Sequence, residues 1–403
     1  MNIEKSFSPT PDLEYALKLL TETTSSQENL PKICPNTGIG EMDTLDLLAP
    51  HVLGSASYLD SPNALAHMDP PTPWITWAMA LWNARLNQNL LHPAVSPFAT
   101  QAEKLVIQWL IPFFGMGGGH MCSGSTVANL TAIWAARDSK NITEVVTSQS
   151  AHLSIEKASK ILGLKFRKVP TNKKGQIDSE QLGDLSNACL VLTAGTTTSG
   201  AIDSLKLIGK AKWTHVDAAW AAPLRLSPKY AKLLDNIENA DSISISAHKW
   251  FFQPKDSAIV LFKDIKTSNE AISFGGSYLT TPNIGVQGSR GASAISLLAT
   301  FIAFGTNGIV EIIEHSIDMS NKLYKELSKE KSISILEKPQ TAITIFRPLN
   351  CSTKSFFEQL PKNMFSTCMI DDKLWIRSVA VNPLADMDKI ISTIKKALQD
   401  NNA

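Results

Sequence analysis

The chain has 403 residues, of which 43% are apolar and 19% are charged. At about 150 residues per domain, this length predicts two to three domains, or one large α/β unit with small appendages. The apolar content suffices for a substantial core and excludes an intrinsically disordered chain. The 38 Lys and Arg balance 37 Asp and Glu without a run of like charge. This excludes a nucleic-acid arm and a polybasic membrane anchor, and we expect a small-molecule partner.

The cysteines indicate neither a disulfide framework nor a metal site. Five are present, an odd number, and no two have the CxxC spacing of a zinc-ligand pair. The first residues lack the basic and then apolar order of a signal peptide. The most apolar internal stretch, Ala292 to Phe304, is too short to span a bilayer. We therefore expect a cytoplasmic protein with reduced thiols and no membrane partner.

Residues 1–80 are expected to form an N-terminal helical arm, because short helical patterns alternate there with proline-containing segments such as Asp69–Pro73. A helix is predicted from Thr100 to Leu110, followed by a glycine-rich turn at Gly115–Gly119. A second helix is predicted from Gly124 to Asp138.

Short apolar runs then alternate with helical stretches. Six strands are predicted: Glu144–Thr147, Phe166–Val169, Cys189–Thr193, Trp213–Val216, Ser242–Ile245 and Ala258–Phe262. This alternation favours an α/β domain with a mostly parallel sheet covered on both faces, over residues 81–295.

Residues 296–403 are expected to form a small α+β C-terminal domain. A long helix is predicted from Ala292 to about Lys329, and a final helix from about Asp386 to Leu398. Between them, three strands are predicted: Ser332–Leu336, Ala342–Arg347 and Leu374–Val379.

The segment Ser246–Phe252 places Lys249 directly after an apolar strand and among bulky apolar residues. Most lysines are solvated. A lysine in a desolvated pocket instead has a lowered pKa and can act as a neutral amine that forms a Schiff base. Lys249 is therefore a candidate catalytic residue.

Asp217, in the segment His215–Trp220, is expected at the carboxyl end of a strand, where open parallel sheets bind their ligands. It either caps the following turn or, in a cofactor site, keeps a pyridine nitrogen protonated so that the ring accepts electrons.

Three further candidates follow other strands or open a helix. Ser125 and Thr126 begin a helix, where hydroxyls and free amides form either an anion site or a plain N-cap. His152 is either structural or stacked on a flat cofactor. The hydroxyls of Ala194–Thr198 either bind a ligand or belong to a turn. Together these residues predict a small-molecule site at one edge of the sheet.

These residues resemble the group II pyridoxal-phosphate-dependent amino-acid decarboxylases, the family of the aromatic amino-acid, glutamate and 2,4-diaminobutyrate decarboxylases. The matching segments, in family order, are Ser96–Glu103, Ser123–Leu130 with Ala135–Arg137, Ala151–Lys157, Ala194–Asp203, His215–Trp220, Ala247–Trp250 and Gln287–Arg290. Trp375–Arg377 and Asn382–Pro383 extend the likeness. The resemblance implies fold type I, with pyridoxal 5'-phosphate as the cofactor, and a homodimer.

The resemblance also implies a role for each matching residue. Lys249 would hold the cofactor as a Schiff base, Asp217 would pair with the pyridinium nitrogen, and His152 would stack on the ring and act in catalysis. Further cofactor contacts are Ser125, Thr126, Thr197, Ala219, Ser246 and His248, with Gly288 and Ser289 reaching the phosphate from the other subunit. Tyr278 resembles the tyrosine that returns a proton to Cα, and Arg377 matches an arginine near the substrate carboxylate. Alternatively, Tyr278 is an aromatic residue packed in a loop, and Arg377 belongs to a structural ion pair.

The expected reaction is the decarboxylation of an L-amino acid to an amine and carbon dioxide, at a site on the subunit interface. The alternatives are another carbon–carbon lyase, an aldehyde-forming oxidase, and a dimeric scaffold without activity. Only nine residues separate Tyr278 from Gly288, which leaves little room for a long lid over a neighbouring site. The sequence does not identify the amino acid.

Overall fold

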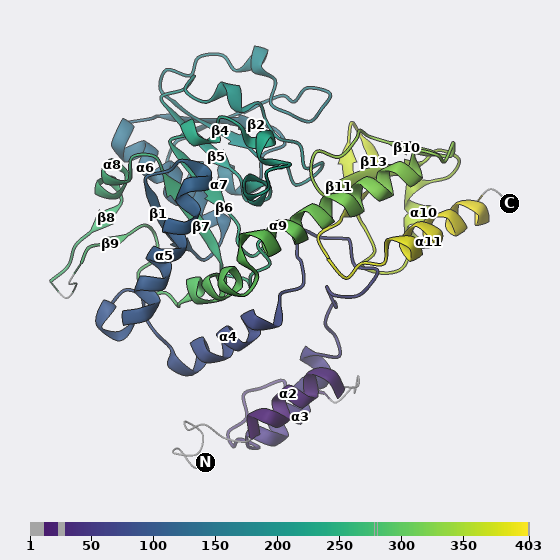
Figure 1. Ribbon diagram of the computed structural model, residues 1–403, viewed down its shortest axis with the longest axis horizontal. Coiled ribbons are helices and arrows are strands. Elements are labelled where there is room, and N and C mark those ends of the chain that lie inside the picture. The colour runs from purple at the N-terminus through teal and green to yellow at the C-terminus, as the bar shows by residue number, and fades with distance from the viewer. Residues whose placement is uncertain (1–11, 23–28, 278, 280, 402–403) are drawn as a thin grey trace. The chain divides into compact units, whose positions relative to one another are not determined.

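The computed structural model describes residues 12–22, 29–277, 279 and 281–401 (Figure 1). The chain divides into two compact units, residues 1–58 and 59–403. The described part of the first unit contains helices α2 (Asp12–Glu22) and α3 (Glu41–Val52), which pack together. The second unit contains both larger sheets. The domain boundaries expected after residues 80 and 295 stay predictions.

The second unit is built around a seven-stranded sheet of order β1-β7-β6-β5-β4-β2-β3. Its strands are β1 (Gly118–Cys122), β2 (Glu144–Ser148), β3 (Lys165–Val169), β4 (Ala188–Thr193), β5 (Trp213–Asp217), β6 (Ser242–Ile245) and β7 (Ala258–Phe262). Strands β2 to β6 pair in parallel, whereas β7 is antiparallel to both of its neighbours. The predicted, mostly parallel sheet is therefore confirmed.

Side chains of the central strands alternate between two cores, one on each face of the sheet. Cys189 and Val191 of β4 belong to one core, and Leu190 and Leu192 to the other, as the two-residue period of a strand requires. The first face is covered by α6 (Ser125–Lys140), α7 (Leu153–Ile161) and α8 (Ile265–Ala271), and the second by α5 (Pro97–Phe114) and α9 (Ser293–Leu327). Because both faces are covered, every residue of strands β4 to β7 is buried.

Strand β1 corrects the prediction of a glycine-rich turn over Gly115–Gly119. Gly115 does end α5, with a φ of 61°, but Gly118 and Gly119 belong to a strand. A Cβ atom on Gly119 would lie 2.1 Å from the carbonyl oxygen of Val260 in β7. Glycine thus allows β1 to approach β7 closely.

We expect Gly119→Ala to lower the free energy of unfolding by about 1–3 kcal/mol, because the added methyl group meets the backbone of a central strand. Denaturant titration measures this loss. Gly275→Ala is the matched control, since a Cβ atom at Gly275 has nothing within 4 Å. Equal midpoints for the two variants would contradict the close approach of β1 to β7.

Helix α9 leads from the large sheet to a second sheet (Figure 1). Helix α4 (Trp74–Leu86) packs on α9. Gly305 interrupts α9 with a φ of 62° and a ψ of 177°. By length and apolar composition alone, α9 is able to cross a membrane. Its residues Leu297, Ile313 and Leu323 nevertheless belong to the buried core of this unit.

The second sheet is antiparallel, with the order β10-β11-β13-β12. The remaining elements are β10 (Ile333–Ile335), β11 (Ile343–Pro348), β12 (Ser366–Ile370), β13 (Lys373–Val379), α10 (Thr353–Glu358), α11 (Met387–Asp400) and the short pair β8 (Ser273–Phe274) and β9 (Asn283–Ile284). The α+β character predicted for the C-terminal part is confirmed. Strand β12 was not predicted, because its residues alternate between partly buried and exposed positions at a sheet edge.

Candidate active site

Four parallel strands, β2, β4, β5 and β6, end side by side at one edge of the large sheet. Asp217 is the last residue of β5, and Thr193, the last of β4, lies opposite it in register. His152 follows the end of β2, and Lys249 follows the end of β6. The structure brings Lys249, Asp217 and His152 close enough for their charges to interact, at the edge where open α/β sheets bind ligands.

Lys249 lies in a tight turn after β6. The amide of Phe252 donates to the carbonyl of Lys249 at 3.0 Å, and Phe252 has a φ of 58°, an uncommon conformation for an aromatic residue. The next residue, Trp250, stacks on Trp220 with ring centroids 4.7 Å apart. Buried aromatic packing thus holds the backbone on which the lysine is mounted.

The Lys249 side chain is partly buried, and burial lowers the pKa of its amine below the usual range. The negative charges of Asp217 and Asp69 oppose this shift in pKa, while the positive charges of Lys255 and Arg377 add to it. A lowered pKa increases the fraction of neutral amine, the form that attacks a carbonyl group.

Asp217 is buried, and its carboxylate accepts three hydrogen bonds. The side-chain amide of Asn129 donates to Oδ2 at 3.0 Å. The amide of Ala219 and the hydroxyl of Ser244 donate to Oδ1 at 3.1 and 3.3 Å. These donors come from a helix, a turn and a neighbouring strand, so the carboxylate is held from several sides. A carboxylate in such a place can pair with a protonated ring nitrogen.

His152 forms the N-cap of α7. The amide of Ser154 donates to its Nδ1 at 3.2 Å, and the hydroxyl oxygen of Ser154 lies 2.8 Å from the same nitrogen. Burial lowers the pKa of the His152 imidazole, and the charge of Asp217 opposes this shift. A neutral, flat ring at this position is suited to lie against a flat aromatic ligand.

A candidate anion site lies where α6 begins. The amides of Ser125 and Thr126 belong to the first turn of the helix, whose amides have no intrahelical acceptor. A Cβ atom on Gly124 would lie 4.0 Å from Cε1 of His248, so this helix start adjoins the segment after β6. The buried Ser246 Oγ and His248 Nδ1 have no hydrogen-bond partner among the described residues. Because buried polar atoms are normally paired, the cluster fits the phosphate of the expected cofactor.

The other predicted cofactor contacts differ in their burial. Ala219 is buried, whereas Thr197 is exposed on the turn after β4. Ser289 is exposed, its hydroxyl accepts from Asn89 at 3.1 Å, and a Cβ atom on the adjacent Gly288 would meet nothing within 4 Å. Tyr278 lies outside the described residues. The roles of these residues stay predictions.

Arg377 lies on β13 of the second sheet, yet its charge acts on Lys249. Its Nη1 donates to the carbonyl of Ala66 at 3.2 Å and to the hydroxyl of Ser366 at 3.1 Å. Its Nε is buried and has no partner in the part of the chain that the structure describes. Among those residues the contacts of Arg377 are with neutral oxygens, so the guanidinium retains a free donor for a carboxylate.

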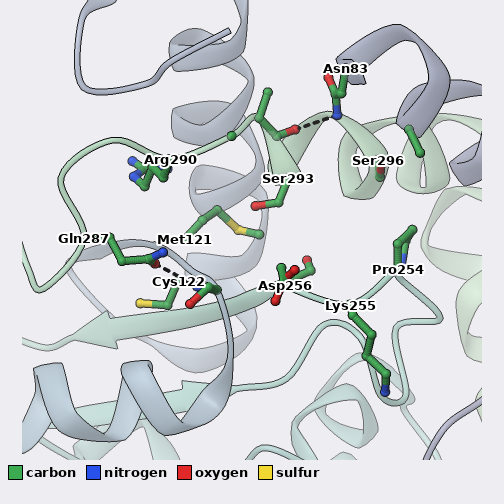
Figure 2. Close-up of a pocket in the computed structure, with 15 residues that line it drawn as sticks. Asn83, Met121, Cys122, Pro254, Lys255, Asp256, Gln287, Arg290, Ser293 and Ser296 are labelled. Atoms are coloured by element: carbon green, nitrogen blue, oxygen red, sulfur yellow. Dashed lines mark hydrogen bonds between the residues drawn. The ribbon is translucent and has the colours of Figure 1, made fainter. Parts of the chain in front are cut away.

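A pocket of about 450 Å³ opens beside the start of α6. In Figure 2, Gln287 and Arg290 lie on one side of it and Lys255 and Asp256 on another. The side chain of Gln287 accepts from the amide of Ser123 at 2.8 Å, which ties the segment that follows β9 to the anion site. Lys249 does not line this pocket, whereas Ser123, two residues before α6, does.

The sequence did not reveal three residues that hold the site in place. Asn129 donates a hydrogen bond to Asp217, and the Ser154 hydroxyl lies within hydrogen-bond distance of His152. Asn129 also donates to that hydroxyl. Glu103 forms an ion pair with Arg290 and accepts from the amide of Met121 at 3.2 Å. A signal for Asn129 was present, because it is the polar neighbour of buried alanines on α6.

The chain matches the model of the pyridoxal-dependent decarboxylase conserved domain over residues 42–348. It is 26% identical to an aromatic-L-amino-acid decarboxylase from Bacillus atrophaeus, with 94% of this chain and 90% of the relative covered. It is 28% identical to an L-2,4-diaminobutyrate decarboxylase from Acinetobacter baumannii, with 77% of this chain and 72% of the relative covered. In structure it is similar to a tryptophan decarboxylase from Catharanthus roseus in complex with L-tryptophan, with a TM-score of 0.83, 19% identity and 96% of each chain covered.

The structural likeness confirms the predicted fold type I. The matched range covers more than half of the chain and contains Lys249, Asp217 and His152. The expected cofactor, pyridoxal 5'-phosphate, is the one that gives this family its name, and the residues at the strand ends fit it. The chain therefore belongs to the family of pyridoxal-dependent decarboxylases.

Proposed function

We propose that this protein removes the α-carboxylate of an L-amino acid as carbon dioxide and forms the corresponding amine. The observation that supports this most directly is the Lys249 amine, whose pKa is lowered by burial and whose charge interacts with Asp217 and His152. When bound, pyridoxal phosphate supplies an electron-withdrawing ring that accepts the electrons of the broken Cα–carboxylate bond.

Each residue would serve a different part of the cofactor. The Lys249 amine would hold its aldehyde carbon covalently. The Asp217 carboxylate would accept from the ring nitrogen and keep its proton in place, and the imidazole of His152 would lie against the ring face. The first amides of α6, with Ser246 and His248, would bind the phosphate.

Arg377 would bind the substrate carboxylate. Its Nη1 is anchored by neutral oxygens, and its buried Nε lacks a partner within the described chain. A guanidinium fixes the orientation of a carboxylate better than an ammonium does. By fixing the orientation of the carboxylate, Arg377 would help to select the Cα–carboxylate bond as the one that breaks.

A panel of L-amino acids tests the reaction. The protein with bound cofactor is incubated with each standard L-amino acid and with L-2,4-diaminobutyrate, and gas release and products are followed by mass detection. We expect carbon dioxide and an equal amount of amine from one or a few substrates. Aldehyde with peroxide would identify the oxidase alternative, and no carbon dioxide from any substrate would contradict the proposal.

We also propose that two copies of the chain form a homodimer with the active site at the interface. Helix α4 carries Trp74, Trp77 and Trp82 with exposed fractions of 71, 57 and 59%. Exposed aromatic residues gathered in this way are uncommon on monomers and typical of interfaces. Ser289 is exposed and the adjacent Gly288 is partly buried, so a second subunit could contact this segment.

Trp77→Glu is expected to weaken the dimer, because it places a charge in the contact. Sedimentation velocity would show a shift towards monomer, and equilibrium dialysis a lower affinity for the cofactor. Ile161→Glu on α7 is the matched control, since Ile161 is also an exposed apolar residue. A wild-type protein that is monomeric and fully active would contradict the homodimer.

We propose a cytoplasmic location. All five cysteines are free, as expected in a reducing compartment. Fractionation of the cells that make the protein tests this, and recovery from a secreted or membrane fraction would contradict it.

A further inference from the structure

A buried network connects Asp217 to His152 through Asn129. Asn129 lies in the second turn of α6, and its side chain is fully buried. Its Nδ2 donates to Oδ2 of Asp217 at 3.0 Å and to Oγ of Ser154 at 2.9 Å. Its Oδ1 lies 2.9 Å from Nε2 of His215. Both amide hydrogens and the carbonyl oxygen are therefore used.

The chemistry of the neighbours determines the direction of each hydrogen bond. A carboxylate has only acceptors, so the amide nitrogen of Asn129 faces Asp217 and its oxygen faces His215. The Nε2 of His215 must then donate. The indole of Trp213 can only donate, and it does so to Ser242 Oγ at 2.9 Å. The proton of that hydroxyl is thus available for Nδ1 of His215, 2.9 Å away.

The protonation of His215 agrees with this assignment. The side chain is fully buried, and burial lowers the pKa of the imidazole to about 4. The ring is therefore neutral near pH 7 and carries a single proton, on the nitrogen that faces Asn129.

The second branch determines the tautomer of His152. The amide of Ser154 donates to Nδ1 of His152 at 3.2 Å, so this nitrogen carries no proton. The Ser154 hydroxyl, 2.8 Å from the same nitrogen, accepts from Asn129 and donates to His152. In the neutral imidazole the proton is then on Nε2.

We propose that Asn129 is a positioning residue that holds the Asp217 carboxylate and, at the same time, orients the Ser154 hydroxyl towards Nδ1 of His152. The proposal rests on the proposed function, in which these two side chains contact the cofactor. A flip of the Asn129 carboxamide would place its oxygen against the carboxylate and break both branches. His215, held by Ser242 on its other side, opposes that flip. The cofactor ring therefore meets one fixed arrangement of charge and donors.

Asn129→Leu tests the proposal in the holoenzyme, because leucine has a similar volume and no hydrogen-bonding group. The readout is the pH titration of the visible absorbance of the bound cofactor, which reports the charge around the ring and does not require turnover. We expect its midpoint to shift by about one to two pH units, the effect of losing one hydrogen bond to a charged group. We also expect kcat to fall roughly 10- to 100-fold, with a smaller change in KM.

Asn382→Leu is the matched control. Asn382 is also buried, and its amide donates to the carbonyl of Ser61 at 2.8 Å, away from the strand ends. Its absorbance midpoint is expected to equal that of the wild type. Ser154→Ala removes a single hydroxyl and tests the His152 branch even if Asn129→Leu does not fold. We expect it to shift the pH profile of kcat while the absorbance midpoint stays near the wild-type value, because the bond from Asn129 to Asp217 remains.

A folded Asn129→Leu protein with the wild-type midpoint would overturn the proposal, and so would a Ser154→Ala protein with the wild-type pH profile. Asp217→Asn distinguishes this from a failure of the proposed function. If Asp217→Asn shifts the midpoint and Asn129→Leu does not, only the role of Asn129 is wrong. If Asp217→Asn also leaves the midpoint unchanged, the carboxylate does not act on the ring, and the proposed role of Asp217 fails together with the inference, whereas the reaction itself is tested separately by carbon dioxide release.

Discussion

We expect Lys249→Ala to abolish the visible absorbance of the bound cofactor and to lower the rate of carbon dioxide release by at least about a thousandfold. The reason is that this amine, with its pKa lowered by burial, is the nucleophile that would hold the cofactor. Removing a group that acts covalently costs far more than removing a group that only binds. Absorbance spectra and a carbon dioxide assay measure the two effects.

Lys263→Ala is the control for this variant. The Lys263 ammonium donates to the carbonyls of Gly115 and Glu238 at 2.9 and 2.8 Å. Lys263→Ala therefore removes the amine of another lysine that has contacts within the protein. Lys263 lies at the opposite end of β7 from the site. The variant should keep the absorbance. A visible band that survives in Lys249→Ala, and is lost only when another lysine is replaced, would show that a different amine holds the cofactor.

The second large effect is expected for Asp217→Asn, which keeps the size of the side chain and removes its charge. In the proposed role of Asp217, the ring nitrogen of the bound cofactor would lose the partner that keeps it protonated, and the ring would accept electrons less readily. Breaking a buried charge pair costs about 3–5 kcal/mol, which corresponds to a fall in kcat of roughly 10²- to 10⁴-fold. Steady-state kinetics and equilibrium dialysis of the cofactor measure the change.

Asp203→Asn provides a matched buried carboxylate. Asp203 accepts from the amides of Ile177 and Thr193 at 2.6 and 2.8 Å, and burial raises its pKa to about 6. Its replacement should affect stability and leave the cofactor spectrum unchanged. If both variants lose only stability, and both keep kcat, Asp217 has a structural role alone.

The parts of the fold that could be predicted are those in which the local pattern and the tertiary environment agree. Strands β4 to β7 are buried on both faces, and they lie where the sequence pattern placed them. Strand β1 could not be predicted, because its glycines have no side-chain pattern and serve close contact with a strand that follows over a hundred residues later. Strand β12 pairs at a sheet edge, where two of its five residues are exposed and the other three are only partly buried.

For the site, the residues that follow strand ends were predictable, because topology alone brings such positions together. Lys249, Asp217 and His152 lie close together because each is at or just after the end of a parallel strand. Asn129 was not predicted, although it touches Asp217, which is 88 positions away in the chain. A helix pattern shows that Asn129 faces inwards, but it does not show which distant carboxylate or histidine is there.

Strand β7 returns beside β6 directly after the turn that carries Lys249, so this turn is held at both ends by paired central strands. The amide of His248 donates to the carbonyl of Ser257 at 3.0 Å and closes the base of the turn. Exposing these amides to solvent would require two buried strands to separate, an opening close in cost to global unfolding. Hydrogen–deuterium exchange at Lys249 should therefore be as slow as in the strands, and the lysine keeps its place while peripheral helices fray.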